Sequence, residues 1–456
     1  MASVILAEWR TLFFYRGGGV FKMTRAGIFV SGTVFIAVSP SWAQSAGGQA
    51  AVNGADTAWV LLSSALVLAM LVPGLALFYG GLVRSKNVLG TIMQSFAILC
   101  LVSVLWMLMG YSLAFGPDVK GLIGSLEWGG LMGVGLAPHA TYAPTIPHQA
   151  FMIFQMMFAA ITPALITGAF AERMKFSALL LFSGLWSLFV YAPVAHWLWG
   201  GGWLAQLGAL DFAGGAVVHT SSGIGALVCV IVMGARHGYG TDYLAPHNLP
   251  MVLLGTGLLW VGWFGFNAGS ALGPNEIAVV AFLATHTAAV AGALAWMAIE
   301  WTHRGAPTIL GIASGAIAGL AMVTPGAGYV GPLAAFVMGL IAGSLSYLVI
   351  IKKGKFGYDD SLDVVGIHGV AGIAGMILTG VLASKTVNPG GADGLLAGDA
   401  GFFAVQIVAV LAVALFSAAV TYGILLLVDR VTGLRVTREE ERAGLDISQH
   451  NERAYS

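Results

Sequence analysis

The sequence contains DFAGGAVVHTSSGIGA at residues 211–226 and DSLDVVGIHGVAGIAG at residues 360–375, and both stretches fit the pattern D-x7-H-x3-G-I. Each stretch lies in an apolar segment and carries one histidine, His219 or His368, eight residues after its aspartate. At 1.5 Å per helical residue, eight residues place a histidine ~12 Å into a hydrocarbon core that is ~30 Å thick. The repeated pattern therefore predicts a duplicated membrane fold with both histidines near its centre.

The composition supports a membrane protein. Of 456 residues, 58% are hydrophobic and only 9% are charged, whereas about a quarter of the residues of a soluble domain are charged. The net charge of zero gives no reason to expect nucleic acid as a partner. We interpret Cys100 and Cys229, which lie inside apolar runs, as small buried residues. Eleven segments have the ~20 apolar residues that a span needs: 57–82, 89–115, 148–171, 176–197, 212–235, 248–270, 276–300, 308–324, 331–351, 362–384 and 400–428. The fold class predicted is an all-α integral membrane protein with eleven transmembrane helices.

The distribution of basic residues predicts the orientation. Loops after the odd-numbered spans, together with the C-terminal tail, hold fourteen lysines and arginines, whereas the opposite loops hold only Lys120 and Lys385. Basic residues are retained on the cytoplasmic side, so the N-terminus of the mature chain is expected outside and the C-terminus inside.

This orientation gives the repeat its symmetry. The fifth span runs inward and the tenth runs outward, so Asp211 begins a helix at the outer face and Asp360 begins one at the inner face. We therefore predict an inverted 5+5 repeat within an eleven-helix domain at 57–428. Its parts are a first repeat at 57–235, a second at 248–384 and an additional helix at 400–428. Functional sites in such folds lie near the midplane, where the repeats meet.

Residues 1–43 are expected to lie outside this domain. A basic start at Met23, an apolar run and Ser41-Trp42-Ala43 form the pattern of a secretory signal peptide cleaved after Ala43. Translation can begin at Met1 or at Met23, and an uncleaved signal anchor is the alternative.

Two histidines at matching depth suggest function, because ionisable residues within a membrane span are costly. They are suited to binding a metal, to relaying protons or to hydrogen bonding with a small polar solute. A stable metal site needs three or four ligands, and the HTSSG and HGVAG stretches that contain the histidines offer no carboxylate or thiol, so no metal or cofactor is predicted. Neutral imidazole offers one donor and one acceptor per ring, which suits a relay or a solute.

A second group of residues is expected at the outer face. Trp199 ends the fourth span, Phe266 and Ser270 end the sixth, and Phe158 lies inside the third. Aromatic faces attract small cations, and a hydroxyl accepts hydrogen bonds from them. An ordinary interfacial tryptophan belt is the alternative for Trp199. Asp211, at a helix start, is expected mainly to accept backbone N–H groups.

The chain closely resembles the bacterial ammonium transporter (Amt/AmtB) family of the Amt/Mep/Rh superfamily over almost its full length after the signal peptide. The resemblance is carried by these stretches: FYGGLVRSKN (78–87), ITPALITGAFAERMKFSA (161–178), HWLWGGG (196–202), DFAGGAVVH (211–219), PHNLPMVLLGTGLLWVGWFGFNAGS (246–270), SGAIAGLAMVTPGAGYVGP (314–332) and DVVGIHGVAGIAG (363–375).

This resemblance implies a multi-pass homotrimer in the bacterial inner membrane, with one pore per subunit. It implies an external ammonium site at Trp199, Ser270 and Phe158, and a gate formed by Phe158 and Phe266. Asp211 would be the structural acid near that site. Ammonium would release its proton at the gate, and NH3 would cross an apolar pore while the proton travels by way of His219 and His368.

The tail at 429–456 is charged and would by itself be interpreted as a solvated end. The resemblance implies instead a regulatory tail on the cytoplasmic face and a PII-type signal protein (GlnK) as a partner there.

Other functions remain open at this stage. An electroneutral NH3 channel, an ammonium sensor with little transport and a Rh-type gas channel are alternatives to transport. Rh-like proteins keep the twin histidines but lack the tryptophan-and-serine site, and sensors usually carry an added signalling domain. A metal-dependent membrane enzyme is disfavoured by the ligand count, so no enzymatic activity is predicted.

Overall fold

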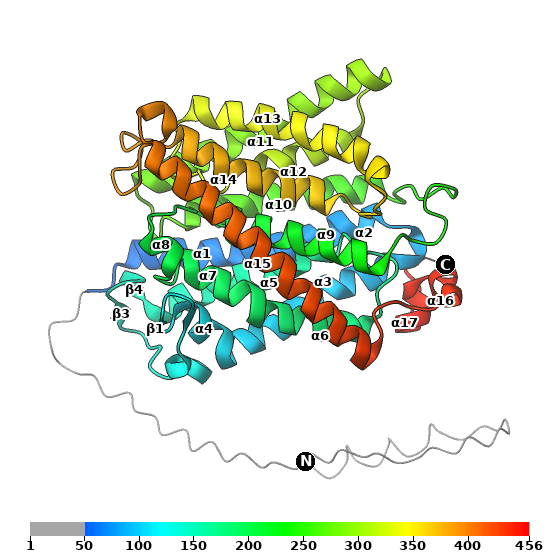
Figure 1. Cartoon of the computed structure of the whole chain (residues 1–456), viewed down its shortest axis with the longest axis horizontal. Helices are drawn as coiled ribbons and strands as arrows, with labels where there is room; N and C mark the ends of the chain where they lie inside the picture. The colour runs from blue at the N-terminus through cyan, green and yellow to red at the C-terminus, as the bar shows by residue number, and fades with distance from the viewer. Residues whose placement is uncertain (1–50, 456) are drawn as a thin grey trace, which may run out of the picture. The chain divides into compact units, whose positions relative to one another are not determined.

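A computed structural model describes residues 51–455, and the predicted signal peptide lies outside them. The described chain is a bundle of long helices (Figure 1). Ten of its helices have the length and composition to cross a membrane, and Ile309–Val323 is a shorter apolar helix. The predicted all-α membrane fold is confirmed, whereas the number of eleven spans stays a prediction. The first half contains α1 (Gly54–Ala69), η2 (Met70–Leu75), α2 (Ala76–Leu82), η3 (Ser85–Asn87), α3 (Val88–Leu105), η4 (Trp106–Gly110), α4 (Tyr111–Phe115), α5 (His148–Ile166), α6 (Phe176–Trp186), η6 (Ser187–Tyr191), α7 (Ala192–Leu198), α8 (Trp203–Gln206), η7 (Gly215–Thr220) and α9 (Ser221–Met233).

The second half continues with α10 (Leu249–Gly269), α11 (Glu276–Arg304), α12 (Ile309–Val323), α13 (Pro332–Lys352), η8 (Lys353–Phe356), η9 (Val365–Gly369), α14 (Val370–Leu382), η10 (Leu395–Ala397), α15 (Ala400–Thr432), α16 (Arg438–Ala443) and α17 (Leu445–His450). Two small hairpins, β1 (Asp118–Val119) with β2 (Ile123–Gly124) and β3 (Pro138–His139) with β4 (Ala143–Pro147), flank the short helix η5 (Leu126–Leu131). The hairpins and the tail helices α16 and α17 lie at opposite ends of the bundle (Figure 1).

Some elements differ from the predicted spans. The first span is interrupted at Pro73, where Val72 leaves the helical region, because proline cannot donate its backbone N–H. The eighth predicted span is the 15-residue helix α12, which is almost entirely buried and rich in alanine and glycine. Such a helix is enclosed by protein, so it can be shorter than one that faces lipid. The interpretation of Cys100 as buried is wrong, because its side chain is exposed on α3, whereas Cys229 is buried.

The two halves cross where their repeated motifs meet. The π-helical turn η7 packs against α14, and its counterpart η9 packs against α9. A Cβ atom on Gly223 would overlap the backbone of Gly369, and one on Gly372 would lie 2.7 Å from the Thr220 nitrogen. The glycine four residues after each histidine therefore allows one repeat to approach the backbone of the other beside the opposite histidine.

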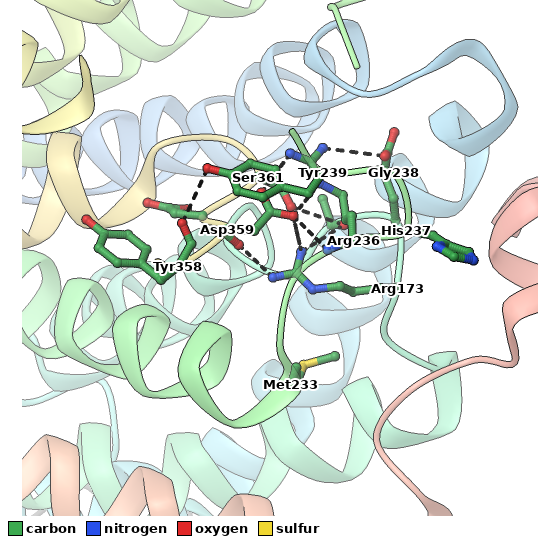
Figure 2. A network of polar contacts seen from close by, with 12 residues as sticks. Arg173, Met233, Arg236, His237, Gly238, Tyr239, Tyr358, Asp359 and Ser361 are labelled. Carbon is green, nitrogen blue, oxygen red and sulfur yellow. Dashed lines mark hydrogen bonds and ion pairs between the residues drawn. The ribbon is translucent and has the colours of Figure 1, made fainter. Parts of the chain in front are cut away.

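A buried ionic network ties together the loops at the tail end of the bundle. Figure 2 shows Arg173 and Arg236 converging on Asp359. Arg236 binds both carboxylate oxygens at 2.9 Å, and Arg173 donates to the Asp359 carbonyl at 2.7 Å. Burial raises the pKa of Asp359 and of Glu172, but hydrogen bonds and the charges of Arg236 and Arg84 outweigh it, so both pKa values lie below the ordinary range. Both carboxylates are therefore ionised at neutral pH.

The tail docks beside this network. Val436 N donates to Arg173 O and Lys175 N donates to Leu434 O, each at 3.0 Å. Asp446 accepts a 2.8 Å hydrogen bond from Gly90 N at the start of α3. The tail thus supplies backbone partners to the bundle instead of remaining solvated along its length.

The close approach of the two motifs at Gly223 predicts that a single added methyl group there lowers the stability of the protein. Gly223→Ala should lower the melting temperature of the purified protein in detergent, because overpacking against backbone costs about 1–3 kcal/mol. Tryptophan fluorescence during heating measures the effect. Gly423→Ala is the matched control, since nothing lies within 4 Å of a Cβ atom there. Equal melting temperatures for the two variants would contradict the close approach.

Candidate functional site

A vestibule opens at the hairpin end of the bundle. It is a cavity of about 280 Å³ whose wall includes Phe158, Trp199, Ser270 and Gln155. The remaining lining residues are Phe115, Thr141, Tyr142, Phe151, Leu198, Phe212 and Leu272. The Trp199 ring lies 5.8 Å from Phe158 and perpendicular to it, and its Nε1 donates to Asp211 O at 2.7 Å. Ser270 Oγ donates to Phe266 O at 2.9 Å, so its oxygen lone pairs stay available as acceptors.

The vestibule ends at two stacked phenylalanines. The Phe158 and Phe266 rings are 4.2 Å apart, centre to centre, and tilted by 31°. Both side chains are buried, with exposed fractions of 1% and 0%. Phe158 lines the cavity and Phe266 lies beyond it, so the pair separates the vestibule from the interior of the bundle.

A row of rings continues from this pair into the centre of the bundle. The His219 ring lies 6.0 Å from Phe266, 5.4 Å from Trp263 and 5.2 Å from His368, and these neighbouring rings are nearly parallel. The turns η7 and η9 that carry the histidines are both π-helical, a local form frequent at functional sites. The structure therefore brings the two histidines together, and it connects them through Phe266 to the vestibule.

Three of the four ring nitrogens of His219 and His368 have no hydrogen-bond partner among the described residues. Within residues 51–455, neither ring nitrogen of His219 and not Nδ1 of His368 has a hydrogen-bond partner, although both residues are buried. Buried polar atoms are nearly always paired, so these unpaired imidazoles leave hydrogen-bonding capacity open at the centre of the bundle. In the described chain, no three His, Cys, Asp or Glu side chains gather as a metal site.

Asp211 holds the helix that presents His219. Its Oδ1 accepts from Gly214 N at 2.8 Å and Gly215 N at 2.6 Å, and its Oδ2 accepts from Ala216 N at 2.8 Å and Val217 N at 3.0 Å. One carboxylate thus satisfies the N–H groups that a helix start leaves unpaired. Asp211 approaches the vestibule only through the carbonyl that Trp199 binds.

Asp360 occupies the corresponding position before η9. It accepts one hydrogen bond, from Val365 N at 2.7 Å, and its Oδ1 has no partner within the described chain. Its carbonyl accepts from Lys353 Nζ at 2.7 Å. Asp360 therefore accepts one backbone N–H group before η9, whereas Asp211 accepts four at the start of η7.

Two further residues of the site, Gln155 and Trp263, lie outside the residues predicted from the sequence. Gln155 lines the vestibule, is 9% exposed, and its Oε1 is without a partner in residues 51–455. Trp263 stacks on His219 and donates from Nε1 to Thr324 Oγ1 at 2.9 Å. A glutamine within an apolar span was the available signal for the first, whereas Trp263 has no distinguishing signal among the other tryptophans of the spans.

Comparison with known protein families shows to which family the chain is related. The profile of the Ammonium Transporter Family matches residues 58–455. The chain belongs to the ammonium transporter family. It is 54% identical to the ammonium transporter of Bacillus subtilis, with 88% of this chain and 98% of that protein covered. It is 47% identical to the ammonium transporter Amt1 of Archaeoglobus fulgidus, with 89% and 100% covered.

Solved structures of a Mep2 protein and of a sensor Amt protein share the fold. Mep2 of Saccharomyces cerevisiae superimposes with a TM-score of 0.80 at 35% identity, with 85% of this chain and 89% of that chain covered. A sensor Amt protein superimposes with a TM-score of 0.79 at 28% identity, with 87% and 98% covered. The predicted family is confirmed, and the chain is a multi-pass membrane transporter of this family with bacterial relatives.

The geometry of Asp211 in this family member predicts a stability effect. Asp211→Asn leaves one acceptor oxygen for four N–H groups, and each unpaired buried N–H costs about 1–3 kcal/mol. The melting temperature of the purified protein should fall. Asp399→Asn is the control, because Asp399 caps α15 through one hydrogen bond, from Phe402 N, that an asparagine oxygen can also accept. A fall no larger than the control's would refute this capping role.

Proposed function

We propose that this protein transports ammonium by binding NH4+ in the vestibule, removing its proton at the phenylalanine pair, and passing NH3 along the histidine row. The observation that carries the proposal is the continuous order of rings from Trp199 through Phe158, Phe266 and His219 to His368. Family membership supplies the solute, because the relatives are named ammonium transporters. Such relatives are transporters, so we assign no enzymatic activity.

The vestibule is suited to a small cation that donates hydrogen bonds. Trp199 and Phe158 offer ring faces. Ser270 and Gln155 offer oxygen acceptors within the same cavity. Hydroxyl and carbonyl oxygens stabilise a cation without a fixed negative charge that would hold it, so release toward the gate remains possible.

The phenylalanine pair explains discrimination against potassium. Potassium resembles ammonium in size and charge, so the vestibule alone separates them poorly. Two stacked, buried rings oppose any bare cation, because transfer of a charge into an apolar site is costly. Ammonium can avoid this cost by losing a proton. In this proposal NH3 then passes the histidine row, and the proton travels through the two imidazoles, giving net uptake.

The wider assembly is part of the same proposal. We place the protein in a bacterial inner membrane, with the hairpin end outside and the tail on the cytoplasmic side. The two repeats are proposed at 57–235 and 248–384, and the additional helix at 400–428.

We propose a homotrimer, and a PII-type signal protein (GlnK) as the partner of the tail face at 429–456. The distribution of lysine and arginine supports the orientation, and the docked tail supports a regulatory role.

An electroneutral NH3 channel is the alternative that the same geometry permits, since the histidine row can pass NH3 without passing a proton. A sensor is less well supported, because the relatives at 54% and 47% identity are named transporters, whereas the sensor Amt protein is 28% identical.

The histidine row predicts a selectivity effect. His219→Ala and His368→Ala should each abolish the ammonium current or lower the ammonium-to-potassium current ratio roughly tenfold, since a lost hydrogen-bonding partner is worth about 1–3 kcal/mol. Currents from proteoliposomes on a solid-supported membrane measure this ratio.

The matched control for these variants is His286→Ala, because His286 lies on the exposed side of α11, away from the row. Parent-like currents from both histidine variants would refute the relay. The absence of any ammonium current from the parent would leave the electroneutral channel as the function.

The vestibule predicts an affinity effect. Gln155→Leu keeps a similar volume but removes the unpartnered oxygen, so the ammonium concentration at half-maximal current should rise roughly tenfold, as expected for a hydrogen bond to a charged donor. Gln149→Leu on the same helix is the control, because Gln149 donates to Val134 O outside the cavity. An unchanged half-saturation in Gln155→Leu would remove this residue from the binding site.

A further inference from the structure

A second cavity, of about 320 Å³, lies where the tail meets the bundle. We call it the tail pocket. Three separate segments line it: the turn after α2, the loop after α9, and helix α16. The lining residues are Arg84 and Lys86, His237, Gly238, Thr241 and Asp242, and Glu441 and Arg442.

The acidic groups of the tail pocket are largely engaged. Glu441 Oε1 accepts from His237 N at 2.6 Å, and its Oε2 accepts from Arg435 Nη2 at 2.8 Å. Asp242 accepts from Thr241 Oγ1 at 3.2 Å. Arg84 is likewise neutralised, because it pairs with Glu172 at 2.8 Å. Asp242 forms none of the ion pairs among residues 51–455, so its single negative charge faces the two positive charges of Lys86 and Arg442, and the balance favours an anion.

Three groups with capacity to donate remain. Lys86 Nζ donates to the Arg442 carbonyl, which uses one of its three N–H bonds. The Arg442 side chain is exposed and takes part in none of the ion pairs among residues 51–455. His237 Nε2 is buried and lacks a hydrogen-bond partner among the same residues. Figure 2 shows the His237 ring directed away from Arg236 and Asp359.

This set of donors matches the chemistry of a phosphate group. Guanidinium binds two phosphate oxygens at once, and an ammonium group contributes a point charge. An imidazole that carries its proton on Nε2 adds a further N–H donor. A tetrahedral anion with several oxygens can engage all three, whereas a carboxylate presents only two oxygens in one plane.

We propose that the tail pocket binds a phosphate group, and that the bound phosphate joins the tail to the bundle through Lys86, His237 and Arg442. Lys86 and Arg442 carry like charges, and the bound anion removes their mutual repulsion. Because the three residues belong to three segments, binding stabilises the docked position of α16. The phosphate can belong to a free solute or to a lipid headgroup.

The test measures binding on the full chain in nanodiscs of phosphatidylcholine, without any transport readout, so its failure is distinct from failure of the proposed transport. Inorganic phosphate is titrated at constant ionic strength with chloride as the balancing anion. We expect a saturable rise in melting temperature, because a ligand that binds only the folded state stabilises it.

Two variants test whether phosphate binds in the tail pocket. Arg442→Gln keeps the backbone carbonyl that Lys86 binds, and it should weaken phosphate binding roughly tenfold or more, as expected for loss of a charge-assisted bond. Arg438→Gln is the control, because Arg438 lies on the same short helix but outside the pocket. It should bind phosphate like the parent.

A second arm identifies the source of the phosphate. Nanodiscs with phosphatidic acid added to phosphatidylcholine replace free phosphate, and the same two variants are compared. Stabilisation by either probe that is lost only in Arg442→Gln supports the site and shows which source it accepts. No stabilisation by either probe, or equal effects in both variants, overturns the proposal.

Discussion

The rest of the structure depends on the contact between the two D-x7-H motifs at their glycines. Gly223 meets the backbone of Gly369, and Gly372 meets that of Thr220. Only without side chains at these positions can the two helices cross closely enough for His219 and His368 to lie 5.2 Å apart. Small residues serve the same purpose generally at membrane helix contacts. Here the contact also sets the positions of the two imidazoles.

Unpaired polar groups are costly in a membrane interior. Buried polar groups that have their hydrogen-bond partners therefore stabilise the fold, and those that lack partners are the candidates for a functional role. Asp211 is fully engaged with four backbone N–H groups, and Asp359 is engaged by two arginines. These groups support the fold. In the described chain the imidazoles of the central pair and the Gln155 oxygen are instead left open. In the proposed mechanism, a solute or proton supplies the missing partner and offsets this cost.

Much of this arrangement could be predicted from the sequence. Long apolar segments and the D-x7-H repeat are periodic signals over many residues, and they predicted the fold class and the juxtaposition of His219 and His368. Exposed faces are harder to predict, because a uniformly apolar helix shows no difference between its lipid and protein sides. Cys100 was misinterpreted for that reason. The role of Gln155 depends on which way α5 faces, and no local sequence pattern encodes this orientation. The docking of the tail depends on backbone contacts with residues 173–175, which no local sequence pattern encodes either.

The phenylalanine pair has a consequence for how such a protein changes over evolutionary time. Because the rings of Phe158 and Phe266 separate the vestibule from the histidine row, no solute can touch Trp199 and His219 at once. In the proposed mechanism, substitutions outside the pair change the affinity for ammonium, and those inside it change which species crosses. Because the two sets of residues lie on opposite sides of the pair, the proposed mechanism lets natural selection adjust affinity for a nitrogen-poor habitat while selectivity stays unchanged.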